Sequence, residues 1–102
     1  MFNAVFFCSF KLKKGASVPD FLLAAEKLNN EYVSKQKGYV SWKQLFDGKT
    51  WADIATFETM EDLNNFMAAS RKPNEVAKKY YSFLRLNPFS CKMYSFSVEK
   101  SY

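Results

Sequence analysis

The chain has 102 residues, a length that fits one domain spanning residues 1–102 and leaves little room for two. Its net charge of +5 comes from lysines scattered among acidic residues, which is typical of a solvated surface and argues against a nucleic-acid partner. Apolar residues make up 48% of the chain and aromatic residues 19%. The core of one small domain usually buries less aromatic surface than this chain carries. We therefore expect a second buried face, at a subunit interface or in a ligand cavity.

Residues 2–12 are expected to form the first strand, with apolar side chains on both faces. The segment lacks the basic start of a signal peptide, and no apolar run is long enough to span a bilayer. Cys8 and Cys91 each fall within an expected strand and are interpreted as free thiols in a reducing compartment. We therefore expect a cytoplasmic protein with no membrane partner.

A helix is expected next, with Ser17 as its N-cap, Asp20 three residues on and Pro19 in its first turn. Gly38 is the expected stop signal. Apolar residues recur along this helix at helical spacing. The stripe consists of Phe21, Leu22, Ala25, Leu28 and Tyr32.

Residues 38–58 contain the strongest local signal, a hairpin in which two aromatic and β-branched runs flank Asp47-Gly48. The pair predicts a two-residue turn. Any even-length turn places the same set of side chains on one sheet face, because side chains alternate and cross-strand partners point the same way. That set is Trp42, Gln44, Trp51 and Asp53.

Thr59 and Asp62 repeat the capping pattern and predict a second helix, which 71–74 should end. Its expected buried residues are Met60, Leu63, Phe66 and Met67. A third helical run is expected to bury Val76, Tyr80, Phe83 and Leu84. Asn87-Pro88 stops that run, and residues 89–99 form the expected last strand.

The resulting order, β-α-β-β-α-α-β, predicts an α+β fold of the ferredoxin-like, split βαβ type. Helices would cover one face of an antiparallel sheet and leave the other face bare in a monomer. The first and last strands carry apolar side chains on both faces. We therefore expect a homodimer formed through the sheet faces.

Four segments carry a resemblance to a known family: Gly38-Tyr39, Asp47-Gly48, residues 51–54 and residues 57–62. With them the chain resembles the dimeric α/β-barrel superfamily, and most closely the small proteins like the antibiotic biosynthesis monooxygenases. The resemblance implies a dimeric α/β barrel. The superfamily includes cofactor-free oxygenases, haem-degrading enzymes, isomerases and proteins with no known activity.

The chain contains no histidine, which removes the usual general base and every Ser-His-Asp or Cys-His site. Imidazole-ligated zinc or haem iron is excluded on the same ground, and two cysteines cannot close a zinc cage. The haem ligand of the haem-degrading relatives therefore has no counterpart. We expect no cofactor and no metal.

Asp53 is the candidate catalytic residue, because burial between two Trp would raise its pKa and let it act as a base. The alternative is a structural carboxylate that accepts hydrogen bonds. Trp42 and Trp51 could stack on a flat aromatic ligand or pack in the core, and Gln44 shares their face. Tyrosine hydroxyls could also bind a substrate, although Tyr80 fits the core better.

The resemblance adds a chemistry to these residues. Cofactor-free oxygenases of the superfamily bind an electron-rich phenol and let it react with oxygen directly. Asn, Trp and Tyr side chains are common in their sites. This chain offers Asn3 and the two Trp for such a site.

Three interpretations remain open: a monooxygenase-like enzyme or binder of a small aromatic molecule, a non-enzymatic dimeric module whose own aromatics fill its cavity, and an RNA-binding domain. RNA recognition motifs share this element order and stack bases on strand aromatics. Residues 37–40 resemble their signature but lie on the second strand, and the short turn at Asp47-Gly48 replaces a long basic loop.

Overall fold

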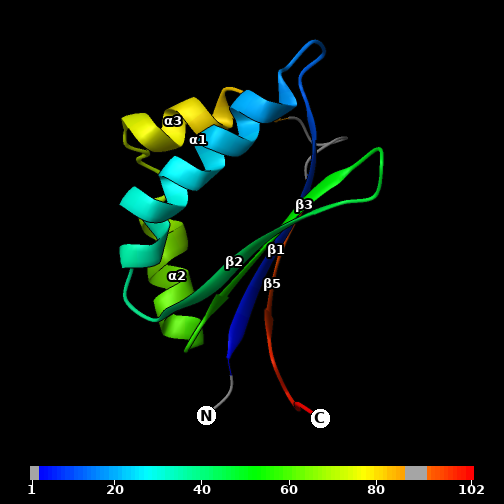
Figure 1. The fold of residues 1–102 in the computed structure, drawn as a ribbon. Coiled ribbons are helices and arrows are strands. Elements are labelled where there is room, and N and C mark those ends of the chain that lie inside the picture. Colours follow the sequence, from blue (N-terminus) through cyan, green and yellow to red (C-terminus); the bar gives the residue numbers. More distant parts are fainter. Residues whose placement is uncertain (1–2, 87–91) are drawn as a thin grey trace.

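The computed structural model describes residues 3–86 and 92–102. Three helices lie together on one side of a twisted antiparallel sheet (Figure 1). The elements, in chain order, are β1 (Ala4–Leu12), α1 (Val18–Glu31), the 3-10 helix η1 (Val33–Lys35), β2 (Tyr39–Phe46), β3 (Trp51–Phe57), α2 (Met60–Ala69), α3 (Glu75–Tyr81), β4 (Leu84–Arg85) and β5 (Lys92–Ser97). Among the described residues, no helix is long and apolar enough to cross a membrane.

β1 lies at the centre of the sheet, antiparallel to β3 on one side and to β4 and β5 on the other. β5 pairs with the first part of β1, and the two-residue β4 pairs with its last two residues. β2 follows β3 at the outer edge. The ferredoxin-like, antiparallel α+β architecture expected from the sequence is therefore confirmed.

The C-terminal part departs from the sequence prediction. Phe83 and Leu84 do not extend the third helix: α3 ends at Tyr81, and Leu84 pairs with Leu12 in β4. The backbone that follows α3 bonds to the C-terminal end of β1 and does not continue the helix: Lys13 N donates a hydrogen bond to Phe83 O. β5 ends at Ser97 rather than Glu99. The predicted stop at 87–88 and the predicted strand start at 89, with Cys91, lie outside the described residues, as does Phe2.

The β2–β3 hairpin has the expected position and parity but a longer turn. Phe46 pairs with Trp51, so the loop has four residues, 47–50, rather than two. The Asp47 carboxylate accepts hydrogen bonds from the backbone N–H groups of Lys49 (2.8 Å) and Thr50 (2.7 Å), which closes the loop around Gly48 at φ +95°. Because four is also even, the predicted side chains still share one face.

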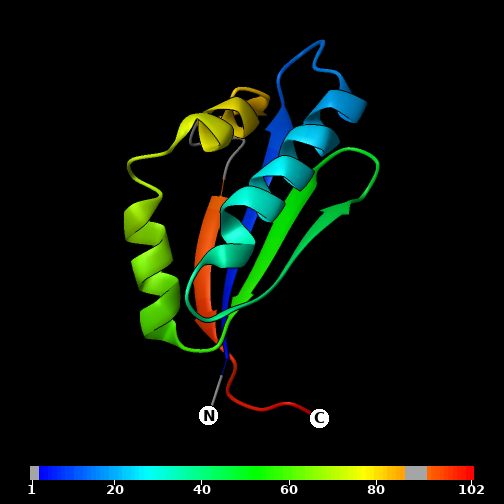
Figure 2. The ribbon, with the colours of Figure 1, turned by 60° about the vertical axis from the view of Figure 1, so that its left-hand side comes forward.

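The core lies between the helices and the even-numbered face of β1, where Ala4, Cys8 and Phe10 are buried. Figure 2 shows α1 lying over the sheet, with α2 and α3 to its left. α1 presents Phe21, Ala24, Ala25 and Leu28 to the core. Leu22, predicted on this stripe, is 42% exposed, because the face actually centres on Ala24 and Ala25.

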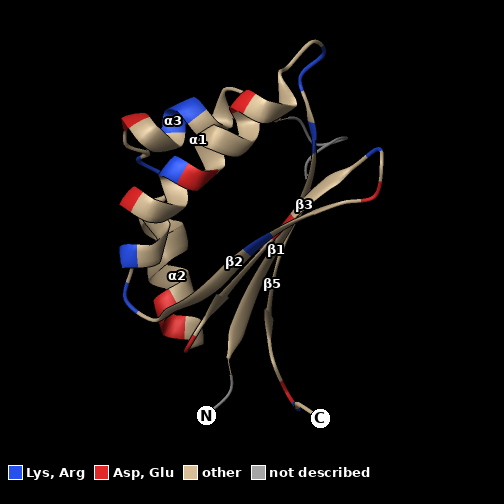
Figure 3. Cartoon of the chain, viewed as in Figure 1, with Lys and Arg blue, Asp and Glu red and all other residues tan. Residues whose placement is uncertain are grey.

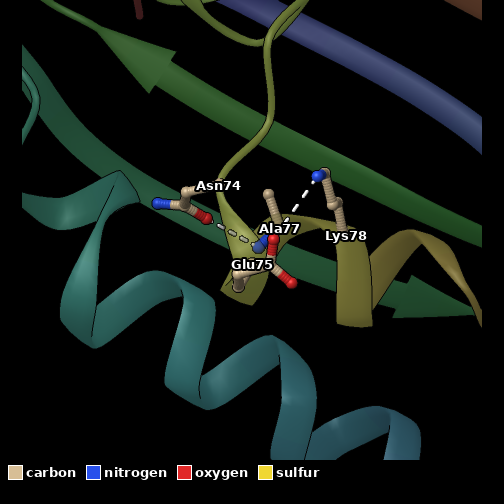
Figure 4. Close-up of polar contacts among 4 residues, drawn as sticks. All are labelled: Asn74, Glu75, Ala77 and Lys78. Carbon is tan, nitrogen blue, oxygen red and sulfur yellow. Dashed lines mark hydrogen bonds and ion pairs between the residues drawn. The ribbon is translucent and has the colours of Figure 1, made fainter.

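Side-chain caps begin all three helices. The predicted caps are confirmed: Ser17 Oγ accepts from Asp20 N (3.2 Å) and Thr59 Oγ1 from Asp62 N (3.0 Å). A third cap was missed, since Asn74 Oδ1 accepts from Ala77 N (2.8 Å) and begins α3 (Figure 4). Over the molecule as a whole, Lys and Arg are interspersed with Asp and Glu (Figure 3), as the sequence indicates.

Candidate functional site

A cavity of about 720 Å³ lies between the sheet and the helices. All five described strands contribute to its lining, and α1, η1, α2 and α3 contribute from the other side. The lining residues are Phe6, Cys8, Leu28, Val33, Trp42, Asp53, Ala55, Phe66, Met67, Ser70, Arg71, Tyr80, Tyr81, Leu84, Leu86 and Met93. This volume falls within the usual range of small-molecule pockets, roughly 300–1,000 Å³.

Asp53 is the buried carboxylate of this cavity, with 8% of its surface exposed. It lies in a row across the sheet in which Gln44, Asp53, Cys8 and Met93 are successive cross-strand partners. The Tyr80 hydroxyl donates a 2.7 Å hydrogen bond to Asp53 Oδ2. Asp53 Oδ1 and Gln44 Nε2 are buried without a hydrogen-bond partner in the structure. An acceptor and a donor are thus left unsatisfied in one region of the fold.

Burial raises the pKa of Asp53 from its ordinary 3.8 to about 6, because the surroundings disfavour the charged form. The side chains of Tyr80, Trp42 and Gln44 oppose this rise by favouring the carboxylate. The pKa of Tyr80 is itself raised, first by burial and then by the negative charge of Asp53. Tyr80 therefore stays protonated as a donor, while Asp53 changes charge close to neutrality and can act as a base.

Aromatic contacts fix Tyr80 in this position. Its ring stacks on Phe21 with centroids 5.4 Å apart, and Trp42 approaches it edge-on at 5.6 Å. The hydroxyl therefore points at Asp53 from a ring held on two sides, which orients the carboxylate in turn.

The structure brings together three of the five site residues expected from the sequence. Trp42 and Asp53 line the cavity, and Gln44 is the cross-strand partner of Asp53, although it does not line the cavity. Trp51 lies apart, stacked on Phe46 at 4.4 Å and beside a smaller hollow of about 290 Å³ near the hairpin loop. Trp51 is on the same sheet face as Asp53 but closer to the hairpin loop, where its ring packs against Phe46 and Phe21.

Asn3 also lies away from the cavity. It is exposed at the start of β1, and its carbonyl accepts a 2.8 Å hydrogen bond from Val98 N. The sequence did not assign Tyr80 or Arg71 to the cavity: Tyr80 was considered as a substrate-binding hydroxyl but fitted the core better, and Arg71 was interpreted as part of a helix break. No local pattern joins them to Asp53, since Tyr80 lies 27 residues away in the chain.

Residues 3–86 and 92–102 contain no group of three or more Cys, Asp or Glu side chains that could hold a metal ion.

Neither the models of known protein families nor the sequences of curated proteins match this chain. Solved structures do match it. SnoaB, a cofactor-independent oxygenase from Streptomyces nogalater, superposes with a TM-score of 0.74 at 12% identity, over 99% of this chain and 97% of its own.

Two further structures widen the comparison. A candidate antibiotic biosynthesis monooxygenase from Bacillus cereus matches with a TM-score of 0.63 at 14% identity, over 100% of this chain and 98% of its own. The hydroxynitrile lyase of Passiflora edulis matches with a TM-score of 0.66 at 16% identity, over 98% of this chain and 96% of its own. At these identities the likenesses show that this chain shares its fold with small proteins of differing activity, and they support the fold that the resemblance in sequence implied.

Proposed function

We propose that the protein binds an electron-rich phenol in the 720 Å³ cavity and oxidises it with molecular oxygen, without a metal or organic cofactor. Asp53 accepts the phenolic proton. The observation that carries this proposal is Asp53 Oδ1, a buried acceptor without a partner at the wall of a cavity. A ligand hydroxyl would satisfy it, whereas Trp42 and Gln44 favour the carboxylate without forming a hydrogen bond to Oδ1 in the structure.

This oxidation needs only a base and an apolar enclosure from the protein. A phenol conjugated to a ring methylene becomes a strong electron donor once its proton leaves, and the resulting anion can reduce oxygen directly. The methylene becomes a carbonyl that keeps one oxygen atom, and the second oxygen leaves as water with the two methylene hydrogens. Asp53 returns the phenolic proton to the phenolate oxygen of the product. All the electrons come from the substrate. The protein supplies a base with a pKa near 6 and an apolar enclosure.

The solved structures support this choice of reaction class without deciding it. SnoaB is a cofactor-independent oxygenase and the Bacillus cereus protein a candidate monooxygenase, whereas the Passiflora edulis protein is a hydroxynitrile lyase. One fold thus carries more than one chemistry, so the residues of the site must decide. Trp42 supports an aromatic ligand, because its ring lines the cavity beside the carboxylate.

The competing interpretation is a non-enzymatic module whose own aromatics fill the space. A cavity of about 720 Å³ favours a ligand over this alternative. Under either interpretation we propose a cytoplasmic homodimer.

Oxygen uptake tests the proposal. The protein is mixed with a panel of electron-rich phenols and ring-methylene phenols in air-saturated buffer with a chelator, and products are analysed after reaction under ¹⁸O₂. We expect uptake with wild type, one labelled oxygen per oxidised product, and loss of turnover in Asp53→Asn. Lys43→Gln, on the opposite face of the same hairpin, should keep full turnover. Equal turnover by the Asp53 variant, or no turnover with any phenol, would remove the proposal.

A further inference from the structure

Arg71 gives the cavity a second polar residue, of opposite charge to Asp53. It follows α2, where its backbone N–H bonds to Ala68 O, and its side chain is exposed while lining the cavity. In the described part of the chain the ion pairs join Lys27 to Glu31 and Lys78 to Glu75. No described acidic side chain reaches the Arg71 guanidinium.

The two charged residues lie in different surroundings. Asp53 is almost completely buried on β3, whereas Arg71 is exposed at the α2–α3 connection, so the cavity has a carboxylate inside and a guanidinium at its rim. In Figure 2 this connection is at the left-hand edge, between the upper end of α2 and α3. The remaining lining is mainly apolar, with Phe66 and Met67 contributed by α2.

We infer that the ligand is a hydroxyaryl carboxylic acid, with its phenolic hydroxyl at Asp53 and its carboxylate at Arg71. The inference rests on the proposed function, since it takes the phenol site at Asp53 as given. Only one orientation suits such a ligand. A carboxylate placed beside Asp53 would lose its water and meet a like charge, while at the rim it keeps partial hydration and gains the guanidinium. The planar fork of arginine matches a carboxylate with two parallel hydrogen bonds.

A pair of ligands of nearly equal shape isolates the contribution of Arg71. 6-Hydroxy-2-naphthoic acid carries a hydroxyl and a carboxylate at opposite ends of a flat ring system, and 6-hydroxy-2-naphthamide replaces the carboxylate by a neutral group. Binding of both is measured by fluorescence titration at pH 7.5 against wild type, Arg71→Gln and Lys72→Gln. Lys72 is the matched control, because it is an exposed cation next in the chain that does not line the cavity.

We expect wild type to bind the acid about threefold to tenfold more tightly than the amide, as a rim arginine–carboxylate contact allows. Arg71→Gln should lose this preference, Lys72→Gln should keep it, and added salt should weaken it in wild type. An acid-to-amide ratio that is the same in wild type and Arg71→Gln would overturn the inference, as would an equal loss in Lys72→Gln.

A third ligand separates this inference from the proposed function. 2-Naphthol has the hydroxyl alone, so its binding depends on Asp53 and not on Arg71. If 2-naphthol binds in an Asp53-dependent way while Arg71→Gln leaves the acid preference intact, the inference about Arg71 fails and the phenol site stands. If the acid preference depends on Arg71 but 2-naphthol ignores Asp53, the carboxylate contact stands and the phenol site fails.

Discussion

Tyr80 donates a 2.7 Å hydrogen bond to Asp53 Oδ2 across the interface between α3 and the sheet. The bond uses one oxygen of the carboxylate and leaves the other unpaired at the cavity. It also leaves Tyr80 without a proton-accepting role, because the phenol stays protonated beside a negative charge. The pair therefore combines an orienting donor with a carboxylate that retains an unused acceptor.

The stability of the protein should fall as the pH rises from about 4 to about 6. The pKa of Asp53 is about 6 when folded and 3.8 ordinarily, so the folded state holds this proton more tightly and loses stability as the proton leaves. The loss amounts to about 3 kcal/mol at most and levels off above pH 6. Urea unfolding of wild type and Asp53→Asn at several pH values measures it.

The asparagine variant lacks this titration, so its stability relative to wild type should increase across the same window. If the difference in unfolding free energy between wild type and Asp53→Asn stays constant between pH 4 and 7, Asp53 does not titrate as described.

Tyr80→Phe should raise the pKa of Asp53 above about 6, because the lost hydrogen bond favoured the carboxylate. The variant should also lose about 1–3 kcal/mol of stability at pH 8, where Asp53 is charged and would lack its donor. Tyr81→Phe is the matched control, since the Asp53 hydrogen bond comes from Tyr80 and not from its neighbour. Equal losses in both variants would assign the effect to packing alone.

The sheet face opposite the helices should form a homodimer. Tyr94 and Phe96 are 48% and 55% exposed there, their rings stack at 5.9 Å, and Phe7 lies 6.4 Å from Tyr94. Sedimentation at micromolar concentration should give twice the mass of one chain. Phe96→Lys should lower the measured mass toward that of a single chain. Leu23→Lys, a change at a 63% exposed residue of α1, should leave the dimer intact. A wild-type monomer would contradict the interface.

Local sequence signals predicted the parts of the fold that local interactions determine. Ser17 and Thr59 cap their helices as expected, and the Asp47-Gly48 pair marks the hairpin whose parity fixes the shared face of Trp42, Gln44 and Asp53. The order of elements followed from these signals. The fold is correspondingly the part that the solved structures confirm.

Long-range competition explains the remainder. Leu84 has helical spacing, yet β1 extends past β5 and pairs with it, which no pattern near Leu84 indicates. Tyr80 and Arg71 come near Asp53 only because α2 and α3 fold over the sheet. Trp51 shares the predicted face but lies toward the hairpin loop, and periodicity specifies a face rather than a position along it.

Binding of 2-naphthol to wild type and Asp53→Asn as a function of pH tests the central claim most directly. The phenol should bind wild type more tightly as the pH rises from 5 to 7, following ionisation of Asp53 with a pKa of about 6. Asp53→Asn should bind about tenfold to a hundredfold more weakly at pH 7 and show no such pH dependence. Asp62→Asn, which removes a buried carboxylate outside the cavity, should behave like wild type. Equal, pH-independent affinities in wild type and Asp53→Asn would contradict a phenol site at Asp53.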